Sequence, residues 1–167
     1  MIVARTPRLL LRHATLDDAP SFLALLTSDG FVRGVGDRGV RTLDDARAYV
    51  QARCVDAYAA DGYAGYAVVR ARDGAFVGQA GLVQRAPHAA VELGYALLPS
   101  FYGHGYAREA AEATLDLARA RGLDSLDAVV LPGNAASLRV LDALGFALVQ
   151  CETPKDAPPF LRYRHAL

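Results

Sequence analysis

The sequence predicts one α/β domain of the α+β type, with a mixed and mostly antiparallel sheet of about seven strands flanked by about four helices. Three observations indicate this fold class. The chain has 167 residues, which is the length of one domain, and no linker-like segment divides it. Residues 63–98 form three strand-like runs separated by turns. Apolar residues recur at helical spacing on both sides of that segment.

Before the three strands, we expect one strand and two helices. The short apolar run at 8–12 is the strand. Thr15 can cap the first helix, and the aspartates that follow it suit the positive end of the helix dipole. The segment 30–41 contains four glycines, which predicts a mobile loop. A second helix is expected at 42–60, with its apolar residues on one stripe.

Turn and cap residues delimit the remaining elements. The Asp-Gly pair at 73–74 is a hairpin signal, and the Pro-His pair at 87–88 turns the chain again. Gly122 and Gly145 are each placed to end a helix. The expected strands are 63–72, 75–84, 90–98, 126–131, 146–150 and 161–165, and the further expected helices are 107–121 and 135–144.

Composition and charge exclude several classes of protein. Hydrophobic residues make up 53% of the chain and charged residues 22%, which argues against a disordered or fibrous protein. The 18 basic and 18 acidic residues cancel, so we expect no nucleic-acid partner. No apolar run is long enough to span a bilayer, so we expect no membrane partner. The first residues lack the apolar core of a signal peptide, which favours a cytoplasmic protein.

The cysteines and histidines indicate neither a metal site nor a disulfide. Cys54 and Cys151 lie far apart and show no spacing typical of metal ligands. We expect two ordinary thiols in a reducing compartment. His13, His88 and His165 show no metal-ligand pattern either, so no metal is expected.

Two glycine-rich segments are candidate binding loops. Residues 34–39 match the pattern G-x-G-x-x-G, which binds a dinucleotide only between a strand and a helix. A helix is expected before this match, so a flexible loop or lid is the better interpretation. The segment 102–107 follows a strand and opens a helix, where unpaired N–H groups and two glycines can receive a phosphate. Arg108 in the first turn fits a bound anion, and a plain tight turn with a surface Arg is the alternative.

The residues around this second loop resemble a known family. Residues 97–110, LLPSFYGHGYAREA, are similar to the acetyl-CoA motif Q/R-x-x-G-x-G/A of the GNAT superfamily of N-acetyltransferases. Tyr102 replaces the usual Gln or Arg, and this aromatic form resembles the RimJ/RimL-type branch. Other segments resemble the same branch in chain order: TPRLLLR at 6–12 with LDDA at 16–19, VELGY at 91–95, and Asn134-x-x-Ser137 followed by LGF at 144–146.

The resemblance implies a GNAT-like single domain over 1–167 that transfers an acetyl group from acetyl-CoA to a primary amine. The amine, on a protein N-terminus or a small molecule, would attack directly in a ternary complex. The pantetheine arm would lie where the strand at 90–98 splays from the strand at 126–131. We expect a monomer or a homodimer. The implied cofactor-binding residues are Leu97, Tyr102, Gly103, His104, Gly105, Tyr106, Ala107, Arg108, Asn134 and Ser137.

Glu92 and Ser137 are the candidate catalytic residues. Strand alternation puts Glu92 on one face with Gly94 and Ala96, where a carboxylate can floor a cleft and accept a proton from the amine, directly or through water. A solvent-facing glutamate is the alternative. The resemblance puts Asn134 on the pantetheine arm and Ser137 near the CoA sulfur as the acid, since no Tyr follows along that helix. Both residues can instead cap the helix.

Two other functions stay open on the sequence alone. The first is a non-catalytic domain that binds acyl-CoA as a sensor or partner module. The missing Tyr allows it, and Glu92 argues against it. The second is a dinucleotide-binding protein that uses residues 34–39. If the protein is an acetyltransferase, its choice of acceptor would lie in 30–41, in the second helix and in the loop at 152–160.

Overall fold

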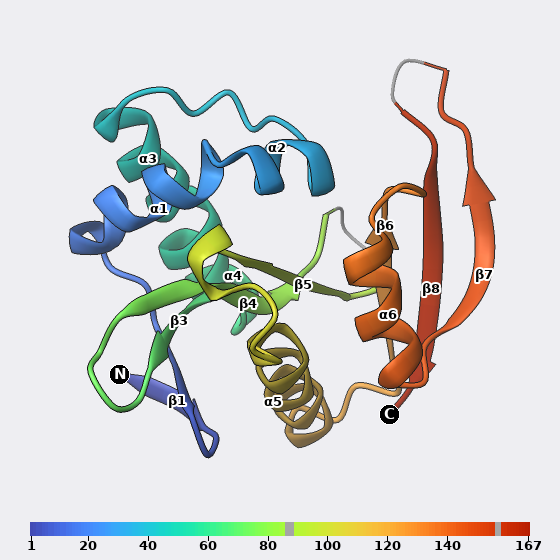
Figure 1. The fold of residues 1–167 in the computed structure, drawn as a ribbon. Helices are drawn as coiled ribbons and strands as arrows, with labels where there is room; N and C mark the ends of the chain where they lie inside the picture. Colours follow the sequence, from blue (N-terminus) through green and yellow to red (C-terminus); the bar gives the residue numbers. More distant parts are fainter. Residues whose placement is uncertain (86–88, 156–157) are drawn as a thin grey trace.

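The computed structural model describes residues 1–85, 89–155 and 158–167, and these form one open sheet with helices on both of its faces (Figure 1). The strands are β1 (Ile2–Arg5), β2 (Leu9–Arg12), β3 (Gly65–Arg70), β4 (Phe76–Val83), β5 (Glu92–Leu97), β6 (Ser125–Val130), β7 (Ala147–Glu152) and β8 (Phe160–Ala166). Their order across the sheet is β1-β2-β3-β4-β5-β6-β8-β7. Neighbouring strands are antiparallel except β5 and β6, which run parallel.

The helices divide between the two faces of the sheet. They are α1 (Ala19–Leu26), α2 (Asp29–Gly34), α3 (Leu43–Val50), α4 (Ala57–Asp61), α5 (Tyr106–Ala120) and α6 (Ala135–Ala143). Ala67 and Ala96 of the sheet pack with buried residues of α1 and α3. Leu93 and Leu97 point the other way and pack with buried residues of α5. The predicted alternation along β5 is therefore confirmed, and this strand separates two apolar layers.

The predicted fold class is confirmed, with one strand more than expected. The additional strand is β1, which pairs with β2 at the edge of the sheet. Its residues are exposed or only part-buried, so its sequence lacks the apolar alternation of a strand with one covered face. The three central strands form the expected meander through the hairpin at 73–74. The predicted turn at 87–88 lies outside the described residues.

The segment between α1 and α3 differs from its prediction. Residues 30–41 were expected to form a mobile loop, and this is wrong for their first part because α2 occupies it. The Ser28 side chain caps α2 by accepting a hydrogen bond from Phe31 N at 3.3 Å. Phe31 itself is 2% exposed and joins the core under α1. A cap and one buried aromatic side chain therefore stabilise a helix in a segment whose glycines predict a loop.

The helix predicted at 42–60 forms, with an irregular centre. Thr42 caps α3, since its side chain accepts from Asp45 N at 3.1 Å while the Asp45 carboxylate accepts from Thr42 N at 2.8 Å. A π-helical stretch at Gln51–Asp56 separates α3 from α4. Gly62 ends α4 in the left-handed region, with φ of 76°.

The sheet opens between β5 and β6. The two strands are paired at one register position, Glu92 opposite Asp127, next to a hydrogen bond from Asp127 N to Val91 O at 3.0 Å. Further along, β5 keeps pairing with β4 up to Leu97, while β6 keeps pairing with β8 up to Val130. The edge of β5 that faces β6 is therefore free of strand pairing beyond Glu92 within the described chain. This is the splay that the resemblance implied.

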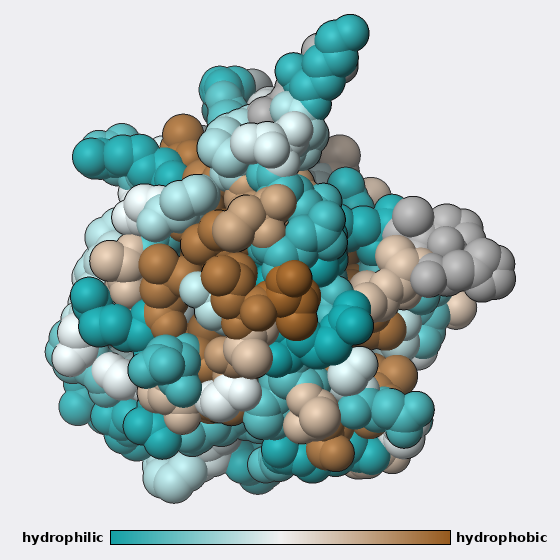
Figure 2. Space-filling model, turned by 90° about the vertical axis from the view of Figure 1, so that its right-hand side faces the viewer, coloured by the Kyte–Doolittle hydropathy of each residue, from teal (hydrophilic) through white to brown (hydrophobic). Residues whose placement is uncertain are grey.

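Strand β7 forms the exposed edge at the far end of the sheet from β1. Figure 2 views the molecule from that side, and hydrophobic residues gather near the middle of this face, with hydrophilic residues around them. On β7 itself, Leu148 and Val149 are each 50% exposed. Among the described residues, none of the helices combines the length and the apolar character needed to cross a membrane.

Candidate functional site

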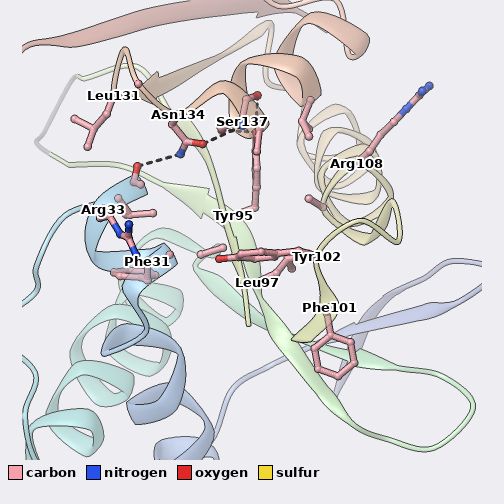
Figure 3. A pocket seen from close by; sticks show the side chains of 18 of the residues that line it. Phe31, Arg33, Tyr95, Leu97, Phe101, Tyr102, Arg108, Leu131, Asn134 and Ser137 are labelled. Atoms are coloured by element: carbon pink, nitrogen blue, oxygen red, sulfur yellow. Dashed lines mark hydrogen bonds between the residues drawn. The ribbon is translucent and has the colours of Figure 1, made fainter. Parts of the chain in front are cut away.

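A cavity of about 970 Å³ lies at the open ends of β5 and β6, between α2, α5 and α6 (Figure 3). Its wall includes most of the residues that the sequence proposed for cofactor binding: Leu97, Tyr102, Gly103, Gly105, Tyr106, Ala107, Arg108, Asn134 and Ser137. His104 and Glu92 do not line it. The His104 ring instead lies 5.6 Å from the Tyr106 ring and stacks on it. The fold thus brings together segments that are up to about 40 residues apart in the predicted site, and leaves Glu92 outside the wall.

One end of the cavity is the N-terminus of α5. Gly103 and Gly105 adopt φ of 75° and 77°, a left-handed conformation that favours glycine. No side chain caps this helix among the described residues, and its first helical hydrogen bond runs from Glu109 N to Gly105 O. The N–H groups before Glu109 therefore lack helical partners and carry the positive end of the helix dipole. A Cβ added at Gly103 would meet nothing within 4 Å, so the space above this loop is open.

Thr6 and Arg8, in the turn between β1 and β2, hold this loop in place. One oxygen of Glu109 accepts from Thr6 Oγ1 at 2.6 Å and from Arg8 N at 2.9 Å, and its other oxygen accepts from Arg8 Nε at 2.7 Å. Arg8 also donates from Nη1 to His104 O at 2.9 Å, and its guanidinium lies 4.8 Å from the centre of the Tyr106 ring. Both segments carry the family resemblance, and this contact joins them across about 100 positions of the chain.

Side chains build the other end of the cavity. The hydroxyl of Tyr95 on β5 lies 2.7 Å from Ser137 Oγ on α6 and 3.3 Å from Ser137 O. Asn134 caps α6, because its Oδ1 accepts from Ser137 N at 3.1 Å. The Asn134 amide also donates from Nδ2 to Gly34 O at 3.2 Å, which ties α6 to the end of α2 (Figure 3). Burial raises the pKa of Tyr95 to about 12.

Helix α2 supplies a further wall of the cavity, within the segment 30–41 that was expected to govern the choice of acceptor. Phe31 lines the cavity, and so does Gly30, where an added Cβ would collide with the Tyr102 hydroxyl. An added Cβ at Gly34 would come within 2.9 Å of Asn134 Nδ2. Two of the four glycines in 30–41 therefore lie where other residues of the site approach the backbone closely. Their presence is the sequence feature that indicates this wall. The match to G-x-G-x-x-G begins at the last residue of α2, so no strand precedes it as a dinucleotide loop requires.

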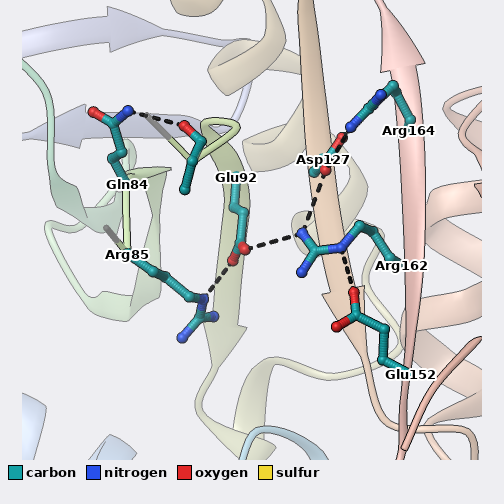
Figure 4. A network of polar contacts seen from close by, with 8 residues as sticks. Gln84, Arg85, Glu92, Asp127, Glu152, Arg162 and Arg164 are labelled. Atoms are coloured by element: carbon teal, nitrogen blue, oxygen red, sulfur yellow. Dashed lines mark hydrogen bonds and ion pairs between the residues drawn. The ribbon is translucent and has the colours of Figure 1, made fainter. Parts of the chain in front are cut away.

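Glu92 lies in a network of ion pairs near the one point where β5 and β6 meet (Figure 4). Its side chain is 6% exposed and contacts Arg85 Nε at 2.5 Å and Arg162 Nη1 at 3.4 Å. The Asp127 side chain, 1% exposed, accepts from Arg164 Nε at 2.6 Å and from Arg162 Nη1 at 3.3 Å. The hydrogen bond from Arg164 is the main cause that lowers the pKa of Asp127. Two buried carboxylates thus share three arginines, which offsets the cost of burying them.

The described residues contain no cluster of three or more side chains suited to hold a metal ion. The polar groups that line the cavity are backbone N–H groups, hydroxyls, amides and the guanidinium groups of Arg33 and Arg108. Such groups can bind an anion at one end and hydrogen-bond a polar acyl group at the other.

Residues 8–147 match the family model described as the acetyltransferase (GNAT) domain. This chain belongs to the GNAT family. YkkB of Bacillus subtilis, an uncharacterized protein, is 40% identical over 77 residues, which are 44% of this chain and 45% of YkkB, so the match spans under half of that relative. YoaA of Bacillus subtilis, an uncharacterized N-acetyltransferase, is 27% identical over 146 residues, covering 86% of this chain and 82% of YoaA.

A solved structure has a similar fold. RimL, a ribosomal L7/L12 alpha-N-protein acetyltransferase in complex with coenzyme A, shares 20% identity with a TM-score of 0.87, covering 100% of this chain and 98% of RimL. At this identity the likeness shows the fold. The predicted family is confirmed, and the chain is an acetyl-CoA-dependent acyltransferase. Acetyl transfer from acetyl-CoA to an amine is the general reaction of this family.

Proposed function

We propose that this enzyme acetylates the primary amine of a protein N-terminus or a small molecule, by direct attack of the amine on bound acetyl-CoA. The observation that carries the proposal is one continuous cavity that joins the uncapped N-terminus of α5 to the Tyr95–Ser137 pair. RimL, to which the fold is similar, acts on the N-terminus of a ribosomal protein. That supports a protein N-terminus as one acceptor class to test.

The α5 end would take the pyrophosphate of CoA. Free N–H groups, the helix dipole and two glycines without side chains suit a phosphate there. The pantetheine arm would run along the unpaired edge of β5 past Leu97, where backbone groups have no strand partner. This path would bring the thioester to Asn134 and Ser137 at the far end.

The chemistry needs a neutral amine, a donor for the thioester oxygen and a group near the leaving sulfur. As its N–C bond forms, the amine loses a proton and the C–S bond breaks, so CoA leaves with the electron pair as a thiolate. Glu92 would accept the amine proton through water, since its carboxylate lies outside the cavity wall. Ser137 would face the sulfur. Holding the two reactants together supplies much of the rate.

Binding is tested by calorimetric titration with acetyl-CoA, using NAD in the same buffer as a control. Saturable binding of acetyl-CoA without binding of NAD is the expected result. A folded protein that binds no acetyl-CoA would refute the proposed site.

Turnover is tested by following CoA release with a thiol reagent and product mass over a panel of peptides and small amines. The Glu92→Gln variant should lose about 100-fold or more in kcat if Glu92 is the base. Glu152→Gln is the matched control, because Glu152 also pairs with Arg162, at 2.7 Å, and is part-buried. Equal losses in both variants would assign Glu92 a structural role. Acetyl-CoA binding without turnover on any amine would favour the non-catalytic module instead.

A further inference from the structure

We infer that Tyr95 is a positioning residue that turns the Ser137 hydroxyl into a hydrogen-bond donor for the departing CoA thiolate. The inference rests on the proposed function, because it assumes that the thioester lies at the Ser137 end of the cavity. Its basis is the contact of 2.7 Å between Tyr95 Oη and Ser137 Oγ, which joins residues 42 positions apart in the chain (Figure 3).

The backbone around Ser137 is fixed, and its hydroxyl is not. Asn134 holds Ser137 N, and the first turn of α6 leaves the serine side chain in the cavity wall. A serine hydroxyl has one proton and can rotate. If Ser137 donates that proton to Tyr95, it offers the cavity only lone pairs. If Tyr95 donates to Ser137, the serine proton is free to point toward a sulfur.

A negative sulfur selects the second arrangement. A thiolate attracts the serine proton and repels an oxygen lone pair, and Tyr95 can then supply the hydrogen bond that Ser137 Oγ accepts. Without Tyr95, the Ser137 hydroxyl that points its proton at the sulfur would have no hydrogen-bond donor for its own oxygen in the cavity wall. The Ser137 position in the first turn of α6 adds the positive end of a helix dipole.

Neither hydroxyl of the Tyr95–Ser137 pair gives up its proton to the thiolate. Burial raises the pKa of Tyr95 to about 12, and an ordinary thiol has a pKa of about 8.5. A thiolate is therefore too weak a base to take a proton from Tyr95 through Ser137. The pair stabilises the charge by hydrogen bonding, and the thiolate is protonated later by water. The other tyrosines of the wall have different partners: the Tyr106 ring stacks with Arg8 and His104, and the Tyr102 hydroxyl lies against Gly30.

The first test needs no acceptor amine. CoA is bound to the wild type, Tyr95→Phe, Ser137→Ala and Tyr63→Phe, and the ionisation of its thiol is followed by thiolate absorbance against pH. Tyr63→Phe is the matched control, since it removes another part-buried tyrosine hydroxyl, bonded to Gln84 Oε1 at 3.0 Å outside the cavity. We expect the bound thiol to titrate about one unit lower in the wild type and Tyr63→Phe than in the other two variants.

The second test is a double-mutant cycle on kcat. Tyr95→Phe should lower kcat about tenfold with little change in the KM for acetyl-CoA, and the double variant should be no slower than Ser137→Ala. A tenfold loss that persists in the Ser137→Ala background would overturn the inference, because Tyr95 would then act independently of Ser137. So would an equal thiol titration in all four proteins. If CoA binds with the expected titration shifts but no amine turns over, the proposed function fails while the contact to sulfur stands.

Discussion

At the α5 end of the cavity the groups available to a ligand are mainly backbone N–H groups, with Arg108 beside them, whereas at the α6 end they are the side chains of Tyr95, Asn134 and Ser137. The first end comes from six consecutive residues. The second needs β5, α2 and α6 to meet. A binding site made of backbone depends on local conformation, so glycines specify it. A site made of side chains depends on tertiary contacts, and a single exchanged atom can break it.

Changing the loop conformation should give the largest effect. Gly103→Ala places a Cβ in the open space above the loop and disfavours its φ of 75°. We expect a loss of acetyl-CoA affinity of about 10- to 100-fold, because hydrogen bonds to a charged phosphate are lost. Isothermal titration calorimetry measures this directly.

Gly122→Ala is the matched control for that change. Gly122 has φ of 72° at the C-terminus of α5, and an added Cβ there also meets nothing within 4 Å. Both variants should lose about 1–2 kcal/mol of folding stability, and only Gly103→Ala should lose affinity. Equal acetyl-CoA affinities in the two variants would show that the phosphate does not bind at this loop.

At the side-chain end, Asn134 is the next test. Asn134→Ala removes both the cap of α6 and the hydrogen bond to Gly34 O, so we expect a loss of about 1 kcal/mol in the free energy of unfolding. Asn134→Asp keeps an oxygen that can accept from Ser137 N but no donor for Gly34 O. Chemical denaturation should therefore place Asn134→Asp between the wild type and Asn134→Ala. If Asn134→Asp matched the wild type, the link to α2 would contribute nothing.

A smaller effect on acetyl-CoA affinity is expected from the side chains that hold the loop at the N-terminus of α5. Arg8→Met removes the side-chain contacts to Glu109 and His104 O and keeps the hydrogen bond from the backbone N to Glu109, and the Arg8 side chain is 49% exposed, so solvent weakens its ion pair. We expect acetyl-CoA affinity to fall two- to fivefold, through a looser loop. Arg119→Met, which breaks an exposed pair with Asp116 elsewhere on α5, is the control. An effect as large as that of Gly103→Ala would mean that Arg8 itself binds the phosphate.

The contrast between the two ends also explains what the sequence could predict. The loop at 102–107 was identified because its chemistry is contiguous: a strand, two glycines and a helix start. The order of strands and helices along the chain, the alternation along β5 and the helix ends at Gly122 and Gly145 were predictable for the same reason. Local pattern was enough in each case.

Contacts across the fold could not be predicted from local pattern. The Tyr95–Ser137 bond and the Asn134–Gly34 bond join residues 42 and 100 positions apart. Helix α2 was not predicted because glycines usually indicate a loop, whereas Gly30 and Gly34 make room here for the side chains of Tyr102 and Asn134. The ion pairs of Glu92 were equally invisible, since strand alternation gives the face of a side chain but not its partners. Its role as a base stays a prediction.

The smallest effect concerns pH, and it sets the conditions for comparing the two ends. His13 lies outside the cavity wall, against the rings of Tyr58 and Tyr66, and its Nε2 is buried without a hydrogen-bond partner among the described residues. Burial, followed by the positive N-terminus and Arg121, lowers the pKa of His13 below its usual range. The unfolded chain therefore binds a proton more readily than the folded chain, so stability is fully present above pH of about 6.5 and declines as pH falls through the lower folded value.

This decline should be shallow, because one partly exposed group causes it. Urea unfolding of the wild type from pH 7.5 to 5 should show a midpoint that falls with pH, and His13→Phe, which keeps a ring against Tyr58 and Tyr66, should flatten that fall. An unchanged slope in His13→Phe would trace the pH dependence to other groups. Since neither end of the cavity contains His13, affinity measured above pH 6.5 reports on the loop and on the Tyr95–Ser137 pair without a change in global stability.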